Sequence, residues 1–195
     1  MIVRPIALAV MLTALFAVRV FAQTVDTPIQ RNINQQNRIE DGLQSGQLST
    51  GEAARLEKGE AKIDKMESKA LKDGSLSAQE ASRIQRAQNQ QSEAIKQLKH
   101  NEVSGNPNSA SSQRMQADVQ RNINQQNRIQ QGVQSGELTN KEVGHLEHGQ
   151  AKVSRAEARA GADGHVGARE HARIQHRANK QSQHIYREKH DRRTR

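Results

Sequence analysis

The stretch QRNINQQNRI, residues 30–39, returns letter for letter at residues 120–129. Around it, residues 30–100 and 120–190 align at a constant offset of 90 without a gap, with 36 identities in 71 positions. An internal repeat of this length indicates one structural unit used twice. We therefore expect the two halves of the chain to share one fold.

Large apolar residues are scarce in this chain. Leu, Ile, Val and Phe make up 25 of the 173 residues after position 22, where Tyr186 is the only aromatic residue. Such a composition is typical of disordered chains, but the spacing of the apolar positions favours helices. The absence of cysteine excludes disulfides and thiolate metal sites.

The first 22 residues have the pattern of a secretory signal peptide. Arg4 precedes an apolar run from Ile6 to Val18, and a V-x-A site ends at Ala22. The alternative, a membrane anchor, needs about 20 apolar residues, and Arg19 interrupts this run. We expect cleavage after Ala22, a periplasmic or secreted protein, and no transmembrane segment in the mature chain.

Helix signals divide the first repeat into three helices. Thr27 followed by Pro28, and two S-x-x-E capping boxes that begin at Ser49 and Ser77, predict the helix starts. Ser45-Gly46 and Asp73-Gly74 predict the ends. The positions expected to face inward are Ile29, Ile33, Gln36, Ile39, Leu43, Leu56, Ile63, Met66, Ala70, Ala81, Ile84, Ala87, Ile95 and Leu98.

The predicted fold class is all-α: two tandem three-helix hairpin or bundle repeats joined by a flexible linker, after a signal peptide. Met115 and Val119 leave open an earlier start of the second repeat. The expected segments are a signal peptide at 1–22, repeat one at 23–100, a Ser/Asn-rich linker at 101–118, repeat two at 119–190 and a basic tail at 191–195.

Both interhelical loops of repeat one share the pattern x-G-x-L-x-x-x-E, from Gly46 to Glu52 and from Gly74 to Glu80. The pattern is similar to the second half of an EF-hand calcium loop, whose first half is degenerate here because Leu43 and Leu71 occupy ligand position 3. We therefore expect the glycine to turn the chain and the glutamate to cap the next helix. The whole module resembles small exported helical-repeat proteins of Gram-negative bacteria with no assigned function, a resemblance that implies export and helicity only.

Charge distinguishes the two repeats. Residues 30–100 carry 12 basic and 10 acidic residues, whereas residues 120–190 carry 12 basic residues, 7 acidic residues and 7 histidines. In repeat one, the acidic stripe from Glu57 to Glu67 is expected to be a solvated flank that pairs with neighbouring helices.

The excess positive charge of repeat two predicts binding to lipopolysaccharide, acidic polysaccharide or anionic lipid. Specific nucleic-acid binding is disfavoured, because Tyr186 alone makes no stacking platform. The candidate polyanion-binding residues are Lys152, Arg155, Arg159, Arg169, Arg173, Arg177, Lys180 and Arg187.

The histidines of repeat two carry the alternative function, a periplasmic protein that binds or buffers transition metals. The candidate ligands are His145, His148, His171 and His176, and they form no H-x-x-x-H pair. His171 replaces Ala81 on the inward face of its helix, which leaves open whether it is buried without a partner or lies in solvent. The spacings contain no catalytic constellation, and they imply no enzyme activity and no cofactor. Because the apolar core is small, we expect partner helices or a second copy of the chain to bury further apolar surface.

Overall fold

The structure is a computed structural model, and it describes residues 25–191. In this part of the chain every regular element is helical, which confirms the predicted all-α class. The helices are α1 (Asp26–Gln44), α2 (Thr50–Ala70), α3 (Ala78–Lys99), α4 (Ala110–Ser135), α5 (Asn140–Ala160) and α6 (Ala168–Lys189), with a short 3₁₀ turn, η1 (Leu71–Asp73), after α2.

The predicted signal peptide at 1–22 lies outside the described residues, as do residues 192–195 of the predicted basic tail. Within residues 25–191, no helix is both long enough and apolar enough to cross a bilayer.

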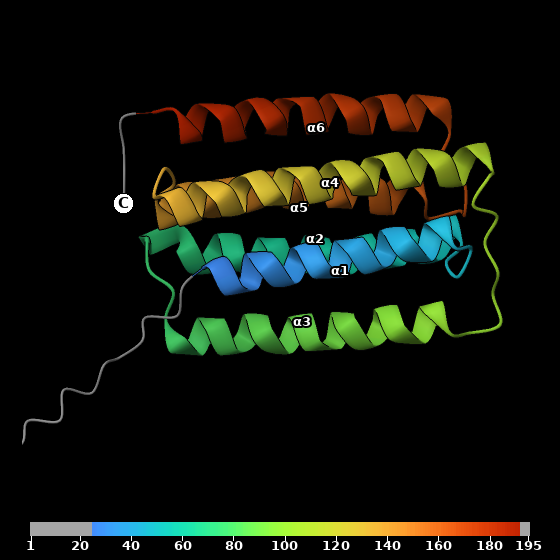
Figure 1. The fold of residues 1–195 in the computed structure, drawn as a ribbon, viewed down its shortest axis with the longest axis horizontal. Helices are drawn as coiled ribbons and strands as arrows, with labels where there is room; N and C mark the ends of the chain where they lie inside the picture. Colours follow the sequence, from blue (N-terminus) through green and yellow to red (C-terminus); the bar gives the residue numbers. More distant parts are fainter. Residues whose placement is uncertain (1–24, 192–195) are drawn as a thin grey trace, which may run out of the picture.

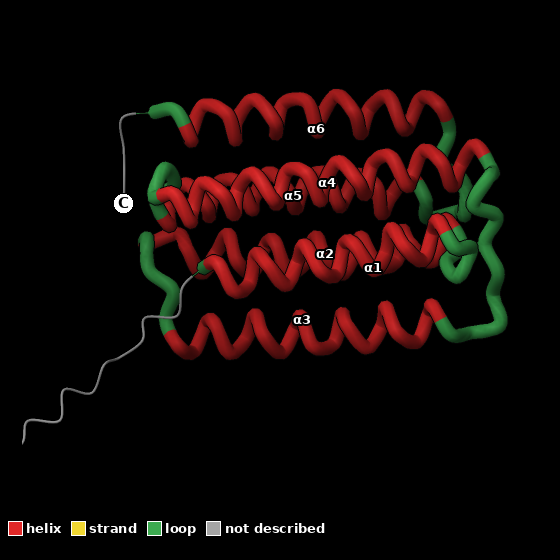
Figure 2. Tube along the Cα trace, in the orientation of Figure 1, coloured by secondary structure: helices red, strands yellow, loops and turns green. Residues whose placement is uncertain are grey.

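The six helices form one bundle with α3 and α6 at its opposite edges (Figure 1). Helices α1, α2, α4 and α5 lie between them, and loops join the helices at the two ends of the bundle (Figure 2). Helix α3 packs on α1 and α2, and α6 packs on α4 and α5. The largest contacts, however, are α2 with α5 and α1 with α4. The two halves of the chain therefore pack face to face and share one interior.

Glycine turns and glutamate caps join the helices as the loop pattern predicts. Gly46 and Gly74 adopt the left-handed conformation, with φ of 75° and 91°. Ser49 accepts a hydrogen bond from the backbone N–H of Glu52, whose carboxylate accepts one from the backbone N–H of Ser49. The glutamates of the other three turns, Glu80, Glu142 and Glu170, likewise accept from the N-cap backbone.

Two predicted helix starts differ from the structure. Helix α1 begins at Asp26 rather than after Thr27, and its N-cap, Val25, makes no side-chain capping bond. Helix α4 begins at Ala110, inside the range 101–118 that composition assigns to the linker. Its added turns bury Met115 and Val119, which extend the apolar stripe of the repeated stretch toward the N-terminus.

The connection between α3 and α4 lies against the turn between α1 and α2. Gly105 donates its backbone N–H to the carbonyl of Gly46 at 2.8 Å, and the Asn101 amide donates to Glu52 at 2.6 Å. A Cβ at Gly105 would lie 2.2 Å from the Leu48 carbonyl oxygen, so glycine permits this close approach. These contacts tie a segment with a linker-like composition to the bundle.

The expected inward positions form most of the interior of the first half. All of them are buried except Met66, Ala87 and Leu98, which are half-buried. The identical stretch at 30–39 and 120–129 also places amide side chains inside: Asn32, Gln35, Gln36, Asn122, Gln125 and Gln126 are each at most 4% exposed.

Two glycines in the middle of helices, Gly59 and its counterpart Gly149, leave room for the buried side chains of Gln91 and Gln181. Gly59 on α2 faces Gln91 on α3, which donates its amide N–H to the Leu56 carbonyl at 3.0 Å and to Glu60 at 2.8 Å. A Cβ at Gly59 would lie 2.0 Å from the Gln91 side-chain oxygen. Glycine has a low helix propensity. The close packing of Gln91 therefore explains why glycine occupies position 59.

We therefore predict that Gly59→Ala destabilises the protein, although alanine is the better helix former. The substitution displaces Gln91 and removes its two hydrogen bonds, at a cost of about 1–3 kcal/mol in the free energy of unfolding. Urea unfolding followed by circular dichroism measures the effect. Gly51→Ala in the same helix is the matched control, since a Cβ there makes only an ordinary contact of 3.4 Å. Equal stability of Gly59→Ala and the wild type would contradict the packing argument.

Candidate functional site

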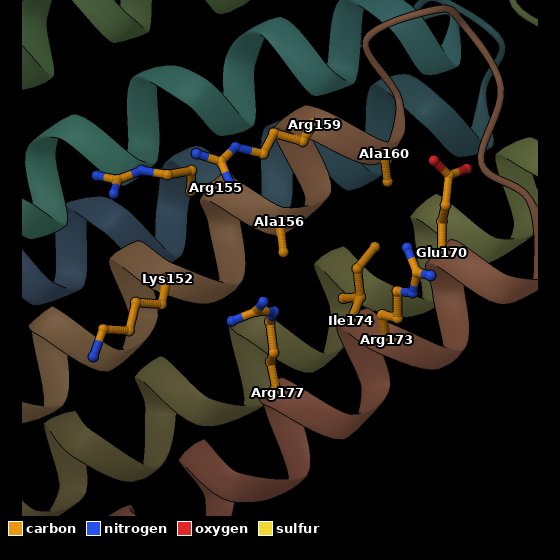
Figure 3. Close-up of a pocket in the computed structure, with 9 residues that line it drawn as sticks. All are labelled: Lys152, Arg155, Ala156, Arg159, Ala160, Glu170, Arg173, Ile174 and Arg177. Carbon is orange, nitrogen blue, oxygen red and sulfur yellow. The ribbon is translucent and has the colours of Figure 1, made fainter.

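A basic groove lies between α5 and α6. Helix α5 contributes Lys152, Arg155 and Arg159, and α6 contributes Arg173 and Arg177 (Figure 3). These spacings of three and four residues place the cations of each helix along one side of that helix. The groove has a volume of about 360 Å³, and its lining includes Ala156, Ala160 and Ile174.

The groove cations have no acidic partner in the part of the chain that the structure describes. All five are exposed, and no ion pair joins any of them to a carboxylate of the described residues. The one acidic side chain in the lining, Glu170, accepts a hydrogen bond from the backbone N–H of Gly167 at the start of α6. The groove therefore presents unneutralised positive charge to solvent.

The structure separates the other three predicted cations from this groove. Lys180 lines a second groove of about 660 Å³, which also includes Lys152 and Arg177. Arg187 lies beside Arg128 and Tyr186, and Arg169 lines neither groove. The second groove adds three lysines that sequence reasoning missed, Lys69, Lys72 and Lys141. Lys69 and Lys72 belong to the first half, so only the packing of the two halves brings them to this surface.

The candidate metal ligands do not converge. His145 and His148 line the second groove together with lysines, and His176 lies beside Arg173 and Arg177. His171 is part-exposed, and its Nδ1 lies 3.1 Å from the Asp118 carboxylate. His171 is therefore not buried without a partner, because α4 begins early enough to place Asp118 beside it.

The acidic stripe of α2 lies in the interior, and the expectation of a solvated flank is wrong. Glu57, Glu60, Asp64 and Glu67 are at most 3% exposed. Asp64 faces α5, where it accepts a hydrogen bond from Ser154 at 3.4 Å, whereas Glu60 faces α3 and accepts one from Gln91 at 2.8 Å. A hydropathy stripe does not reveal this burial. The available signal was the exact repetition of the polar residues in the stretch at 30–39.

These carboxyl groups meet glutamates of α5 in two equivalent pairs. Glu57 lies close enough to Glu157 for one carboxyl to donate a hydrogen bond to the other when it is protonated. Glu67 and Glu147 are the equivalent pair at an offset of 90, and their carboxylate oxygens lie within 4.8 Å of each other. Position 64 lies opposite position 154, so the two halves are related by an approximate twofold axis through this contact.

Amide side chains donate a hydrogen bond to one oxygen of each of the four glutamates. Asn32 donates to Glu67 at 2.9 Å, and Gln36 donates to Glu57 at 3.2 Å. The second copy of the stretch repeats both bonds, from Asn122 to Glu157 at 2.7 Å and from Gln126 to Glu147 at 3.1 Å. The repeated stretch thus supplies the donors that satisfy the buried carboxyl groups.

Burial raises the pKa of these carboxyl groups, because desolvation disfavours the charged form. Burial raises the pKa of Glu57 and of Glu60 to about 8, and that of Glu147 to about 7. Burial and the neighbouring carboxylates also raise the pKa of Asp64 and Glu67 well above the ordinary values. At neutral pH the interior therefore retains protons on several of these groups.

Comparison of the chain with models of protein families, with curated proteins and with solved structures gives no match. The groove and the buried carboxyl groups are therefore the features of the molecule that indicate its function.

We predict that the metal-free protein becomes less stable as pH rises from 5 to 8. Glu57 and Glu60 have an ordinary pKa near 4.5 and a folded pKa of about 8. Between these values the folded state binds more protons than the unfolded state, so stability is present below about pH 4.5 and is lost as pH rises. Thermal melts at pH 5, 6.5 and 8 in a chelator should show a falling melting temperature.

Glu60→Gln provides the control for this prediction. Its side-chain oxygen can still accept the hydrogen bond from Gln91, but it cannot titrate. The variant should therefore show a weaker dependence of melting temperature on pH. A melting temperature that rises from pH 5 to pH 8 would contradict the assignment of raised pKa values.

Proposed function

We propose that this chain is an exported, non-enzymatic binding protein that uses the groove between α5 and α6 to bind a polyanion. The observation that carries the proposal is the set of five exposed cations in this groove, none of them paired with a carboxylate of the described residues. Four of them are arginines, whose planar guanidinium groups bind phosphate and carboxylate in a bidentate way. Phosphate-bearing lipopolysaccharide, acidic polysaccharide and anionic lipid are the partners with this chemistry.

The comparison of the two halves supports a role for the groove beyond solubility. The first half has lysines at positions 62, 65 and 69 and Arg83 at the counterpart of Arg173, but Ala87 at the counterpart of Arg177. Arg177 is exposed and lines both grooves. Its side chain is therefore not part of the core. The difference between the halves therefore concentrates positive charge where α5 and α6 meet.

The surroundings of Tyr186 and of His148 disfavour nucleic-acid binding and a histidine metal site. Tyr186 is 58% exposed and stacks on His190, which gives one aromatic platform rather than a series along a groove. His148 lies near Lys152, Arg155 and Lys65, and burial and these cations lower its pKa. Neighbouring positive charge repels a metal ion as it repels a proton. Export, a tandem-repeat origin and pairing with partner helices or a second copy remain parts of the proposal.

We predict that heparin and lipopolysaccharide bind this groove with an affinity that falls steeply with salt. Neutralising three to five anionic groups releases counterions, so raising NaCl from about 50 to about 200 mM should weaken binding on the order of 10²-fold. The double variant Arg173→Gln, Arg177→Ala should reduce the slope of log Kd against log salt by about 2. Calorimetric titration at four salt concentrations measures both quantities.

The matched control removes equal charge from the first half. Lys62 and Arg83 are the counterparts of Lys152 and Arg173 at the offset of 90. The double variant Lys62→Gln, Arg83→Gln should keep the salt slope and most of the affinity. If both double variants lose affinity equally, binding depends on net charge alone and the groove is not the site.

A further inference from the structure

A group of three carboxylates in the interior stands apart from the other acidic residues. Asp64 and Glu67 on α2 and Glu147 on α5 each place one oxygen within 4.8 Å of the other two. Their exposed fractions are 3%, 2% and 0%. The approximate twofold axis between α2 and α5 brings them together, since Glu147 is the counterpart of Glu57 and lies opposite Glu67.

This carboxylate group has no positive partner among residues 25–191. The ion pairs among residues 25–191 are His171 with Asp118 and Lys189 with Glu137, both outside the group. The lysines of α2 nearest in sequence, Lys62 and Lys65, are exposed. Buried carboxylates are normally paired with a basic side chain or coordinate a metal ion, so the group lacks its usual compensation.

Hydrogen bonds satisfy only part of the group. Both oxygens of Glu67 accept hydrogen bonds, from Asn32 at 2.9 Å and from Gln88 at 3.4 Å. Gln126 donates to one oxygen of Glu147, and the Ser154 hydroxyl lies 3.4 Å from Asp64. The other oxygen of Glu147 is buried and has no hydrogen-bond partner. The hydrogen bond from Gln126 to the first oxygen of Glu147 also fixes the second oxygen in place. A buried oxygen that is fixed in this way and has no partner indicates a water or an ion that would bind it.

A small cavity adjoins two of the three carboxylates, Glu67 and Glu147. Its volume is about 10 Å³, and Glu67 and Glu147 line it together with Ile29, Leu71, Ile84 and Val143. This is about the space of one water-sized sphere, and apolar side chains form most of the remaining wall. The unpartnered carboxylate and the cavity are independent observations that point to one small occupant.

We propose that Asp64, Glu67 and Glu147 bind one divalent cation that prefers oxygen ligands. Oxygens at about 2.4 Å from a shared ion lie at most about 4.8 Å apart, and the three oxygens here lie within that limit. A ligand set of carboxylates without nitrogen or sulfur suits Ca²⁺, Mn²⁺ or Mg²⁺ rather than copper or zinc. Asn32 and Gln126 then act as outer partners that orient the ligands.

The second half of the chain lacks the counterpart of this site. The equivalent residues are Ser154, Glu157 and Glu57, so a serine replaces Asp64 and only two carboxylates remain. The expected stoichiometry is therefore one ion per chain. This difference also provides a matched control, because Glu67 and Glu157 accept the same hydrogen bond from equivalent asparagines, Asn32 and Asn122.

The test uses the full chain after removal of metal with a chelator. Calorimetric titration with Ca²⁺, Mn²⁺, Mg²⁺ and Zn²⁺ chlorides, one at a time, should give one bound equivalent for at least one oxygen-preferring ion and weaker binding of Zn²⁺. At an ion concentration about 100-fold above Kd, the melting temperature should rise by about 5–10 °C. Glu67→Gln should weaken binding at least about tenfold, whereas Glu157→Gln should change it less than about twofold.

Both variants replace a buried carboxyl by its isosteric amide, so melts of the metal-free proteins report whether either one fails to fold. The absence of stoichiometric binding by all four ions would overturn the proposal and leave protons as the only compensation for the buried acids. Equal loss of binding in Glu67→Gln and Glu157→Gln would also overturn it. Calcium binding that survives Glu67→Gln would place the ion in the interhelical loops instead.

Discussion

Hydrogen bonds from buried amides to buried carboxyl groups set the arrangement of the whole bundle. Asn32 and Gln36 on α1 hold Glu67 and Glu57 on α2, and the second half repeats both contacts at the offset of 90. The same glutamates meet across the contact between the halves, Glu57 with Glu157 and Glu67 with Glu147. Because a buried carboxyl without a donor costs several kcal/mol, the stretch at 30–39 and its exact copy fix the position of α1 on α2 and of α4 on α5.

The same polar layer accounts for the way the two halves recognise each other. A chain with so few large aliphatic residues cannot specify a register by apolar packing alone. Sliding α5 by one turn along α2 would separate Glu57 from Glu157 and remove the hydrogen bond that a proton on one carboxyl group allows between them. Such an interface contributes less stability than an apolar one of equal area, but it strongly disfavours other registers. The face-to-face packing of the halves follows from this selectivity.

Helices, turns and caps could be predicted from the sequence because each depends on residues a few positions apart. Gly46, Gly74 and the glutamates that follow them act as the local pattern predicts. The burial of Glu60 and Asp64 could not be predicted in this way, because it depends on a second half whose docking leaves no periodic signal in α2. The basic residues of α5 and α6 were predictable as a surface, whereas the contribution of Lys69 and Lys72 required the contact between the halves.

Helix α5 separates the two kinds of charge, with Lys152, Arg155 and Arg159 exposed and Glu147 and Glu157 buried. The formal net charge of +9 counts every buried carboxyl as fully negative. Burial raises the pKa of these groups, so protons or a bound cation neutralise part of that negative charge at neutral pH. The formal value therefore understates the positive charge of the folded protein. The buried acids leave the field of the basic groove largely uncompensated, and the interior that fixes the fold also favours the attraction of polyanions to the surface.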